Sequence, residues 1–353
     1  MTLPRNMSGV YRTRHGEPDA WEDRTDIPVP TPGAGQVLVQ VLAAGVNNTD
    51  INTRIGWYSS DVTGSTDSGE VGEAGGHAGA LDFPRIQGGD LCGRVVALGQ
   101  GVDNITIGDR VTCAINLPRP TVANPTAYIA LGSEFDGAFA QYCRVDAADL
   151  FNVSTSPLTD AEIAAMPCAY GTAYNLLHRA GLAAGKSILI TGASGGVGMA
   201  AVQIAALKGA RVTGVASKAK QAEVKQMGAT QVLGRAEPLP ENQFDIVIDV
   251  VAGDAFQSLI SALKPAGHYA TSGAIAGPIV TADLRQIYLR DITIHGCTFT
   301  PRAVFAELVE LMNAGTLRPL VSAKYPLAKI HEAQEKFMEK SLPGKIVLLP
   351  ETL

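Results

Sequence analysis

The sequence predicts a two-domain protein in which an α/β domain with a doubly wound parallel sheet interrupts a β-rich domain. The 353 residues are more than one ordinary domain needs. From residue 158 to 298, strand-like and helix-like segments alternate, as in parallel sheets covered by helices on both faces. Residues 1–157 carry short strand-like runs broken by Gly and Pro, and residues 299–353 end in another, so these two pieces form the β-rich domain.

The composition is that of a soluble globular chain. Hydrophobic residues make up 46% and charged residues 18%, which supports a large core and argues against long disorder. The net charge of −6 gives no general reason to bind nucleic acid or an anionic membrane. The N-terminus lacks the apolar core of a signal peptide, and no apolar run could span a bilayer. Five widely scattered cysteines, an odd number, favour reduced thiols and a cytoplasmic location.

The first β-rich piece contains three strand candidates, at Gln36–Ala44, Leu91–Leu98 and Arg110–Ala114. Between the first two lies Trp57–Asp82, which is rich in Gly, Ser, Thr and acidic residues and has few apolar anchors. This stretch is either a mobile surface loop or a lid over a substrate pocket, because long loops often carry function.

The α/β domain is predicted to begin with helical segments at Asp160–Met166 and Ala173–Arg179. Its main strands are expected at Ser187–Thr191, Arg211–Ala216, Phe244–Val251, His268–Ser272 and Ile292–Cys297. One helix carries Val197 and Lys208 on the same face, and another covers Lys218–Met227 and ends at Gly228. The second β-rich piece then holds a helix at Ala303–Asn313 and a last strand at Lys345–Leu349.

The strongest local signal is the Gly-rich turn between the strand Ser187–Thr191 and the helix after it. The spacing G-x-x-G-x-x-G comes from Gly192, Gly195 and Gly198, and the same turn contains Ser194, Gly196 and Val197. Glycine permits the tight turn and lets the backbone approach a pyrophosphate, while the helix N-terminus supplies free N–H groups. The turn therefore predicts a dinucleotide site of the Rossmann type, and a merely structural tight turn is the weaker alternative.

The end of the second strand predicts NADPH rather than NADH. NAD enzymes usually place an acidic residue there to bind the ribose 2′-hydroxyl, but Ala216 and Ser217 stand at that place. Lys218 and Lys220 follow, and Arg235 comes after the next strand, so cations are available for a 2′-phosphate. The alternative is that these lysines only begin a solvated helix.

Several motifs together resemble the medium-chain dehydrogenase/reductase superfamily. They are GVNNTDINTR from Gly45, GGDLCGRVVALGQGV from Gly88, GDRV from Gly108, GAFAQY from Gly137, the GASGGVG turn and GKIVLLP from Gly344. The resemblance covers nearly the full length in the superfamily's order. It implies a GroES-like β domain around a Rossmann domain, an active site in the cleft, and a homodimer or homotetramer joined through the Rossmann sheets.

The zinc alcohol dehydrogenases of this superfamily bind catalytic zinc with a Cys, the His of a Gly-His-Glu segment and a second Cys. This chain has Asn47 and Gly89 at the first two positions and keeps only Cys168 at the third. Asp90 and Cys168 alone are too few ligands, and Cys113 stands alone where a structural-zinc lobe needs four cysteines. No metal is expected, and Cys168 is interpreted as a small buried side chain.

Asn47 instead resembles the zinc-free quinone oxidoreductases, whose Gly-x-Asn-x-x-Asp pattern is reproduced by Gly45, Asn47 and Asp50. This resemblance suggests that Asn47 donates its amide to a substrate oxygen. Those enzymes often carry Tyr near the position of Asn52, and Tyr58 is the nearest aromatic hydroxyl in this chain, so it is the second candidate donor. Asp50 is either catalytic or a structural acid that caps a helix.

The resemblance also implies further cofactor contacts. Thr172, in the AYGTAY segment, is expected to face the nicotinamide. The same side is expected to be lined by residues at the ends of later Rossmann strands, namely Val250, Val251, Ser272, Gly273, Thr298 and Phe299. Lys345 either reaches the cofactor or substrate or is a plain surface lysine. The six histidines are scattered, with no i, i+4 pair or acidic partner evident, and none is assigned to catalysis.

These features predict a zinc-independent oxidoreductase that transfers hydride from NADPH to a small-molecule quinone or α,β-unsaturated carbonyl compound. Without a metal as Lewis acid, simple alcohol oxidation is disfavoured, whereas hydrogen-bond donors can stabilise the charge that develops when an electron-poor π system accepts hydride. The segments GGDLCG and GASGGVG also resemble the crotonyl-CoA reductase branch, so an enoyl-CoA reductase is one alternative. A non-catalytic NADPH-binding protein is another, and a zinc alcohol dehydrogenase is the last.

Overall fold

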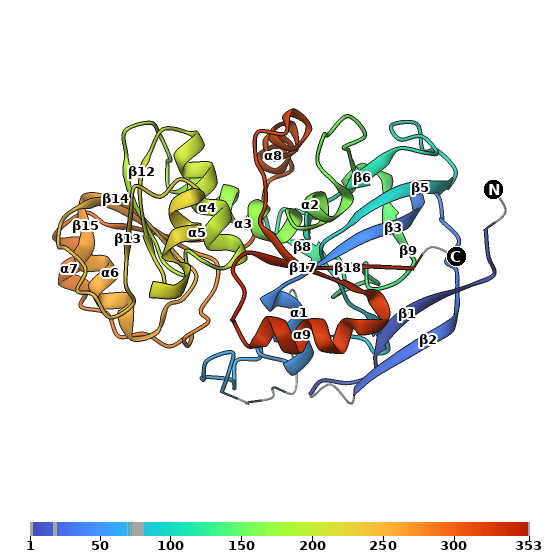
Figure 1. Cartoon of the computed structure of the whole chain (residues 1–353), viewed down its shortest axis with the longest axis horizontal. Helices are drawn as coiled ribbons and strands as arrows, with labels where there is room; N and C mark the ends of the chain where they lie inside the picture. The colour runs from blue at the N-terminus through green and yellow to red at the C-terminus, as the bar shows by residue number, and fades with distance from the viewer. Residues whose placement is uncertain (1–2, 17–19, 69, 71, 73–80, 352–353) are drawn as a thin grey trace. The chain divides into compact units, whose positions relative to one another are not determined.

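The computed structural model describes residues 3–16, 20–68, 70, 72 and 81–351, and the chain divides into two compact units (Figure 1). The catalytic unit contains Met1–Val62, Val71–Cys168 and Pro301–Leu353. The Rossmann unit contains Thr63–Glu70 and Ala169–Thr300. An α/β unit thus interrupts a β-rich unit, as the fold class predicted from the sequence requires.

The elements of the catalytic unit come from both ends of the chain. Its strands are β1 (Asn6–Arg12), β2 (Trp21–Pro28), β3 (Gln36–Val46), β4 (Arg85–Ile86), β5 (Cys92–Leu98), β6 (Arg110–Thr112), β7 (Asn116–Pro118), β8 (Tyr128–Ala130), β9 (Tyr142–Asp146), β10 (Phe151–Asn152), β17 (Val321–Pro326) and β18 (Lys345–Leu349). Its helices are α1 (Asn48–Ile55), α2 (Asp160–Ala164), α8 (Arg302–Ala314) and α9 (Ile330–Met338), with short 3-10 turns at η2 (Ala147–Asp149) and η5 (Leu327–Lys329).

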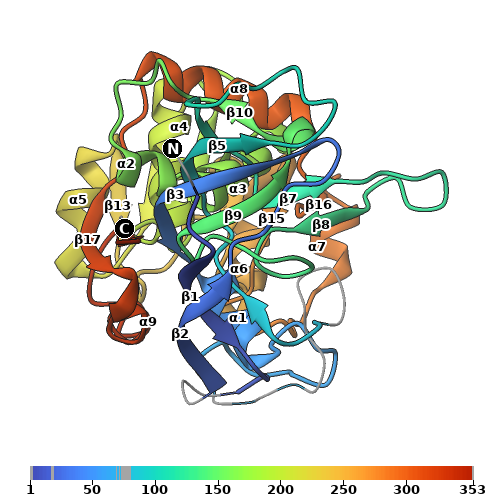
Figure 2. The ribbon, with the colours of Figure 1, turned by 90° about the vertical axis from the view of Figure 1, so that its right-hand side faces the viewer.

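The central sheet of the catalytic unit has the order β10-β6-β5-β3-β18-β17, and β9 also pairs with β3. The predicted strand at Gln36–Ala44 is β3, whose residues are largely buried. The predicted last strand is β18, which pairs antiparallel with β3 through Ile346 and Val46. The second piece of the chain therefore completes the sheet that the first piece begins. The strands β7 and β8 form a separate ribbon whose loop projects outward (Figure 2).

The domain boundary lies later than the predicted position after residue 157. The helix α2, expected in the α/β domain from its place in the sequence, packs on β3, β5 and β18 of the catalytic unit. Its buried Ile163 and Ala164 explain this placement, because an apolar helix face packs on whichever sheet leaves an apolar surface uncovered. Sequence periodicity identifies such a helix but not the sheet that receives it.

The Rossmann unit is a six-stranded parallel sheet with the order β13-β12-β11-β14-β15-β16. Its strands are β11 (Ser187–Ile190), β12 (Arg211–Val215), β13 (Gln231–Leu233), β14 (Phe244–Asp249), β15 (Leu263–Thr271) and β16 (Thr293–Gly296). Its helices are α4 (Gly196–Leu207), α5 (Gln221–Gln226), α6 (Phe256–Ala262) and α7 (Leu284–Tyr288), with turns η3 (Lys218–Lys220) and η4 (Gly253–Ala255). The helix α3 (Pro167–Arg179) begins at the boundary and continues into this unit.

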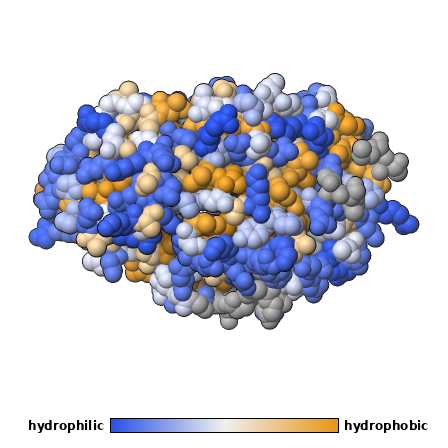
Figure 3. All heavy atoms as spheres, viewed as in Figure 1, coloured by the Kyte–Doolittle hydropathy of each residue, from blue (hydrophilic) through white to orange (hydrophobic). Residues whose placement is uncertain are grey.

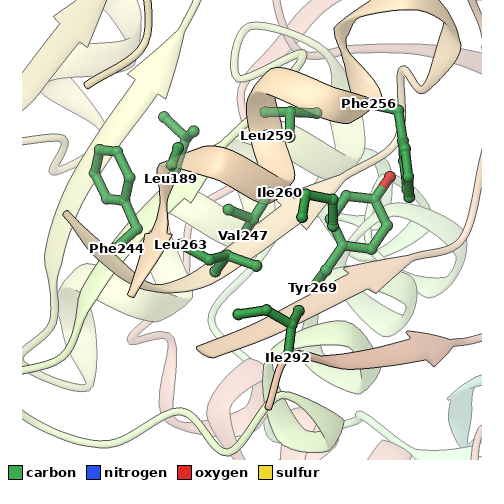
Figure 4. Close-up of a cluster of buried hydrophobic side chains, with 10 residues drawn as sticks. Leu189, Phe244, Val247, Phe256, Leu259, Ile260, Leu263, Tyr269 and Ile292 are labelled. Atoms are coloured by element: carbon green, nitrogen blue, oxygen red, sulfur yellow. The ribbon is translucent and has the colours of Figure 1, made fainter. Parts of the chain in front are cut away.

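The core of the Rossmann unit explains why the central strands β11 and β14 are buried along nearly their whole length. Side chains from β11, β14, α6 and β15 gather in one cluster, in which Phe256 and Tyr269 meet edge to face (Figure 4). A parallel sheet covered on both faces buries consecutive residues rather than alternate ones. The strand expected at His268–Ser272 begins earlier, because Leu263 already pairs with Phe244 of β14. Hydrophilic residues predominate on the face of this unit drawn in Figure 3.

The stretch Trp57–Asp82 is described only in part. Two apolar residues of this stretch, Trp57 and Val62, are buried in the catalytic unit. Thr66 belongs to the Rossmann unit, where its backbone N–H donates to Ile275 O at 3.1 Å. Residues 69, 71 and 73–80 lie outside the described residues, so the choice between a surface loop and a lid stays open. Among the helices described, none has the length and apolarity that crossing a membrane requires.

Candidate active site

The helix α1 places Asn47 and Asp50 in a buried polar cluster of the catalytic unit. Asn47 is the extended residue before the helix, and its backbone N–H donates to Asp50 Oδ2 at 2.8 Å. This bond satisfies one of the donors that every helix start leaves open. This geometry therefore supports the interpretation of Asp50 as a structural acid that caps the helix.

We define the polar cluster as Asn47, Asp50, Asp90, Cys168 and Lys345, all of which are more than nine-tenths buried. Asp90 lies at its centre. Its Oδ1 accepts the backbone N–H of Cys168 at 2.6 Å. Its Oδ2 accepts Asn47 Nδ2 at 2.9 Å and Lys345 Nζ at 3.0 Å. A buried carboxylate needs a charge partner and hydrogen bonds, and Asp90 has both.

Gly45 leaves the space that the Asp90 carboxylate occupies. A Cβ at position 45 would lie 2.3 Å from Asp90 Oδ2 and 2.6 Å from Ala164 O. Both distances are shorter than heavy atoms allow, and one of the two neighbours is backbone. The Gly of the Gly-x-Asn-x-x-Asp pattern therefore has a packing reason in this chain.

The carboxyl group of Asp50 has a raised pKa. Its burial raises the pKa of the Asp50 carboxyl to about 7, partly opposed by the hydrogen bond from the backbone of Asn47. The nearby charge of Asp90 raises this pKa further, whereas the Lys345 ammonium lowers it. Asp50 is therefore a carboxyl group that changes its charge near neutral pH.

Tyr58 lies beside the polar cluster. Its hydroxyl receives hydrogen bonds from the side chains of Thr49 and Asn52, and its burial raises the pKa of Tyr58 well above the usual value. The hydroxyl therefore stays protonated and can donate. The structure puts the Tyr58 hydroxyl next to the side chain of Asn52. Tyr58 and Asn47 are thus brought into one region of the catalytic unit.

The residues at the zinc positions do not fit a zinc ion. A Cβ at Gly89 would lie 2.3 Å from Ile115 Cδ1, so this place has no room for the imidazole of a ligand. Burial raises the pKa of Cys168 to about 12, whereas zinc binds the thiolate. The Lys345 ammonium already contacts Asn47 and Asp90. Within the described part of the chain, no set of three or more His, Cys, Asp or Glu side chains is arranged to hold a metal.

The Gly-rich turn of the Rossmann unit has the geometry that a pyrophosphate needs. Gly192 has φ of +55°, in the left-handed region that favours glycine. A Cβ on Gly198 would lie 2.2 Å from Gly192 O, so only glycine fits where α4 approaches the turn. A Cβ on Gly195 would meet only Gly192 O, at 3.4 Å, so space remains at the helix N-terminus. These residues fit a bound dinucleotide.

The predicted 2′-phosphate residues gather after β12 and β13. Ala216 is buried and Ser217 precedes the turn η3, so no carboxylate stands at the end of β12. Burial lowers the pKa of Lys220, and the nearby charge of Arg235 lowers it further. Two cations that repel each other are stabilised when an anion comes between them. Lys218 is exposed in the same turn.

Sequence reasoning missed Asp249, which fixes the carboxyl ends of two central strands. Asp249 is fully buried and accepts the hydroxyls of Thr191 and Tyr269, each at 2.5 Å. It also accepts the backbone N–H of Val251 at 2.9 Å. Thr191 directly follows β11 and precedes Gly192, so Asp249 holds the start of the Gly-rich turn against the end of β14. An acid inside the apolar run FDIVIDVV was the available signal.

The remaining predicted cofactor residues belong to the Rossmann unit. Those after its strands lie at the carboxyl edge of the sheet, where open parallel sheets bind ligands. They are Val250 and Val251 after β14, Ser272 and Gly273 after β15, and Thr298 and Phe299 after β16. Thr172 lies on α3 and is half-buried, as are Ser272, Gly273 and Phe299.

Lys345 is not a surface lysine, because its side chain is only 3% exposed. Its contact with the cofactor stays a prediction.

The histidines are less isolated than the sequence suggested. His268 Nδ1 lies 3.0 Å from His295 Nε2, because β15 and β16 are paired and His295 is opposite Ala270, two residues beyond His268. His331 Nε2 lies 4.0 Å from Asp23 Oδ2. Neither contact involves the polar cluster or the Gly-rich turn, and no catalytic role is assigned to them. Contacts between strands depend on register, which spacing along one segment does not reveal.

Comparisons with known proteins identify the family. Residues 33–155 match the model of the alcohol dehydrogenase GroES-like domain, and residues 196–314 match that of the zinc-binding dehydrogenase. A crystal structure of a candidate alcohol dehydrogenase from Sinorhizobium meliloti 1021 is 38% identical, with a TM-score of 0.88. The match covers 99% of this chain and 98% of that one. The chain belongs to the medium-chain dehydrogenase/reductase superfamily.

Similar curated proteins are oxidoreductases. The quinone oxidoreductase of Lama guanicoe is 29% identical over 99% of each chain. The acryloyl-coenzyme A reductase of Metallosphaera sedula is 28% identical over 94% of this chain and 97% of its own length. The 2-methylene-furan-3-one reductase of Solanum lycopersicum is 26% identical over 99% of this chain and 81% of its own length. These relatives support an oxidoreductase of this superfamily.

Proposed function

We propose that the protein is a zinc-independent reductase that uses NADPH to reduce quinones or α,β-unsaturated carbonyl compounds. The observation that carries this proposal is the buried Asn47 amide, held by charged partners at the place where zinc relatives position a metal ligand. The Gly-rich turn and the cations Lys220 and Arg235 support NADPH as the cofactor. The names of the quinone oxidoreductase and enone reductase relatives support the substrate class.

The proposed chemistry matches the donors that this chain provides. Bound NADPH supplies hydride. Addition of hydride at the β-carbon of an enone moves the π electron pair toward the carbonyl oxygen, and a proton from water completes the reduction. Asn47 and Tyr58 donate hydrogen bonds to the oxygen on which this negative charge develops, which lowers the barrier. A donor that is already fixed before the reaction is more effective than one that must reorient.

The test is oxidation of NADPH, followed by its near-ultraviolet absorbance, against quinones, enones and enoyl-CoA thioesters, with and without a chelator. We expect turnover of a quinone or an enone that the chelator does not change. Turnover abolished by the chelator would overturn zinc independence. Tight NADPH binding without turnover of any compound would favour a non-catalytic NADPH-binding protein.

An enoyl-CoA reductase is the second candidate, supported by the relatives named acryloyl-coenzyme A reductase. Its carbon–carbon double bond is activated by a thioester carbonyl, so the same donors serve it. The same panel separates the two. Enoyl-CoA turnover that exceeds turnover of the matching simple enone by a hundredfold would assign CoA recognition to this chain.

We also propose a cytoplasmic homodimer, with a homotetramer as the larger alternative. The strand β16 is at the edge of the parallel sheet, and Ile294 on it is 44% exposed. Nearby α7 exposes Leu284 and Tyr288, and Leu289 follows it, also exposed. An unpaired edge with exposed apolar side chains favours pairing with another chain. All five cysteines are buried free thiols, which supports a reducing compartment.

A further inference from the structure

The Lys345 ammonium uses all three of its donors inside the catalytic unit. Its Nζ donates to Val46 O and to Asp90 Oδ2, each at 3.0 Å, and to Asn47 Oδ1. An ammonium group has three N–H donors and no acceptor. In this geometry Lys345 therefore has no donor left for a cofactor or a substrate, and whatever it contributes to a reaction passes through the residues that it contacts.

These contacts select one orientation of the Asn47 amide. The amide oxygen faces the Lys345 ammonium, and Nδ2 donates to the Asp90 carboxylate. If the amide were flipped, its NH₂ group would face the ammonium and its oxygen would face the carboxylate. Both contacts would then be repulsive, in a place where burial strengthens electrostatic interactions. The two charges therefore determine which side of the amide carries the oxygen.

The selected orientation leaves one Nδ2 proton of Asn47 for a ligand. The amide group has two N–H donors, and the hydrogen bond to Asp90 uses one of them. The ammonium on the amide oxygen also draws electron density from the nitrogen, which makes the second N–H a stronger donor. A rigid, polarised donor is what a developing oxyanion requires.

We propose that Lys345 and Asp90 are positioning residues that hold the Asn47 amide with one Nδ2 proton available to the carbonyl oxygen of the substrate. Lys345 then supplies a fixed positive charge at the site where zinc relatives place a metal, and it acts on the substrate through the amide. The proposal rests on the proposed function, because it assumes a substrate with an activated carbonyl group. In this proposal Lys345 positions Asn47 and does not bind the cofactor itself.

The test is a double-mutant cycle on the full-length protein with Lys345→Met and Asn47→Ala. Asn47→Ala is expected to lower kcat about 100-fold, as removal of a single oxyanion donor does, with NADPH affinity unchanged. Lys345→Met is expected to lower kcat at least tenfold through the same group, so the double variant should be no slower than Asn47→Ala alone. Multiplied losses, or weaker NADPH binding in Lys345→Met, would overturn the proposal in favour of direct cofactor contact.

A second pair of variants guards against loss of folding, because Lys345→Met leaves Asp90 buried without its charge partner. Asp90→Asn combined with Lys345→Met removes both charges and keeps the side-chain volumes similar. It should fold and still lose kcat at least tenfold, since a neutral amide at position 90 no longer selects the orientation of the Asn47 amide. Full kcat in this folded variant would overturn the proposal. Lys329→Met is the control, because Lys329 is an exposed lysine of the same unit.

An NMR measurement tests the geometry without turnover. In protein labelled with ¹⁵N at asparagine, the Asn47 side-chain signal is the one that Asn47→Ala removes. Lys345→Met should shift this signal and speed the exchange of its protons with water, whereas Lys329→Met should leave it unchanged. A signal that does not respond to Lys345→Met would overturn the proposal. A wild-type protein that reduces no compound while its amide signal responds would contradict the proposed function instead.

Discussion

At the scale of single residues, the polar cluster depends on a balance between buried charges. Lys345 pairs with Asp90, while Asp50 is buried nearby with a raised pKa. Burial disfavours each charge separately, so the charge state of one member depends on the others. This dependence makes two of the residues testable by stability measurements that need no substrate.

Asp50 should make folding stability depend on pH. Its pKa is about 7 in the folded chain and 3.8 in an unfolded one, so the folded state binds more protons between these values. The contribution of Asp50 to the free energy of unfolding is therefore fully present below about pH 4 and is lost as the pH rises through 7. The loss is at most about 4 kcal/mol. Chemical unfolding of the wild type and of Asp50→Asn at several pH values measures this. The prediction would be contradicted if the unfolding free energy changed with pH equally in both proteins between pH 4 and 7.

Gly45→Ala should displace the Asp90 carboxylate. Its new Cβ would lie 2.3 Å from Asp90 Oδ2 and 2.6 Å from the backbone oxygen of Ala164, so we expect a loss of about 1–3 kcal/mol in unfolding free energy and a lower kcat. Gly296→Ala is the matched control, because a Cβ there meets nothing within 4 Å, and surface changes are usually worth less than about 0.5 kcal/mol. Similar unfolding free energies for the two variants would show that Asp90 moves without penalty.

At the scale of elements, short connections after parallel strands carry the predicted cofactor specificity. The strand β12 ends next to η3, and β13 ends just before Arg235, because the two strands pair in parallel. Parallel pairing brings the carboxyl ends of β12 and β13 together. Lys220 and Arg235, fifteen positions apart in the sequence, thereby come close enough to repel.

Lys220→Ala combined with Arg235→Ala should weaken NADPH binding by about 10- to 100-fold, since hydrogen bonds to charged groups are each worth about 1.5–3 kcal/mol. NADH binding should change little, because NADH has no 2′-phosphate. Titration calorimetry with both dinucleotides measures the difference. Lys225→Ala, on an exposed position of α5, is the control. If NADPH binding and NADH binding were weakened equally, these residues would not belong to the 2′-phosphate site.

At the scale of the whole molecule, the exposed edge of the Rossmann sheet bears on assembly. The chain has a mass of 36.8 kDa, and light scattering during gel filtration gives the mass of the assembly. We expect Ile294→Asp to reduce the mass to that of one chain, because a charge on the edge strand opposes pairing. Val122→Asp, on the exposed loop after β7, should leave the mass unchanged. An unchanged assembly in Ile294→Asp would exclude this edge as the interface.

The fold class, and the candidate site residues as predictions, follow from the sequence. The strands β11, β12 and β14, the glycines of the turn and the second-piece strand β18 follow from periodicity and turn chemistry, because these are local properties of the chain. The residues at positions 47 and 89, Asn and Gly, likewise exclude the usual zinc ligands by their chemistry alone. The family assignment confirmed the predicted fold class and superfamily.

The contacts among the site residues follow only from the way the whole chain folds. Lys345 lies 298 positions from Asn47 in the sequence, and only the antiparallel pairing of β18 with β3 brings them into contact. The same is true of Asp249 with Tyr269 and of His268 with His295, which depend on strand register. Spacing within a segment predicts on which face of its helix or strand a side chain lies. The partner of that side chain across a sheet depends on strand order and register, which result from packing of the whole chain.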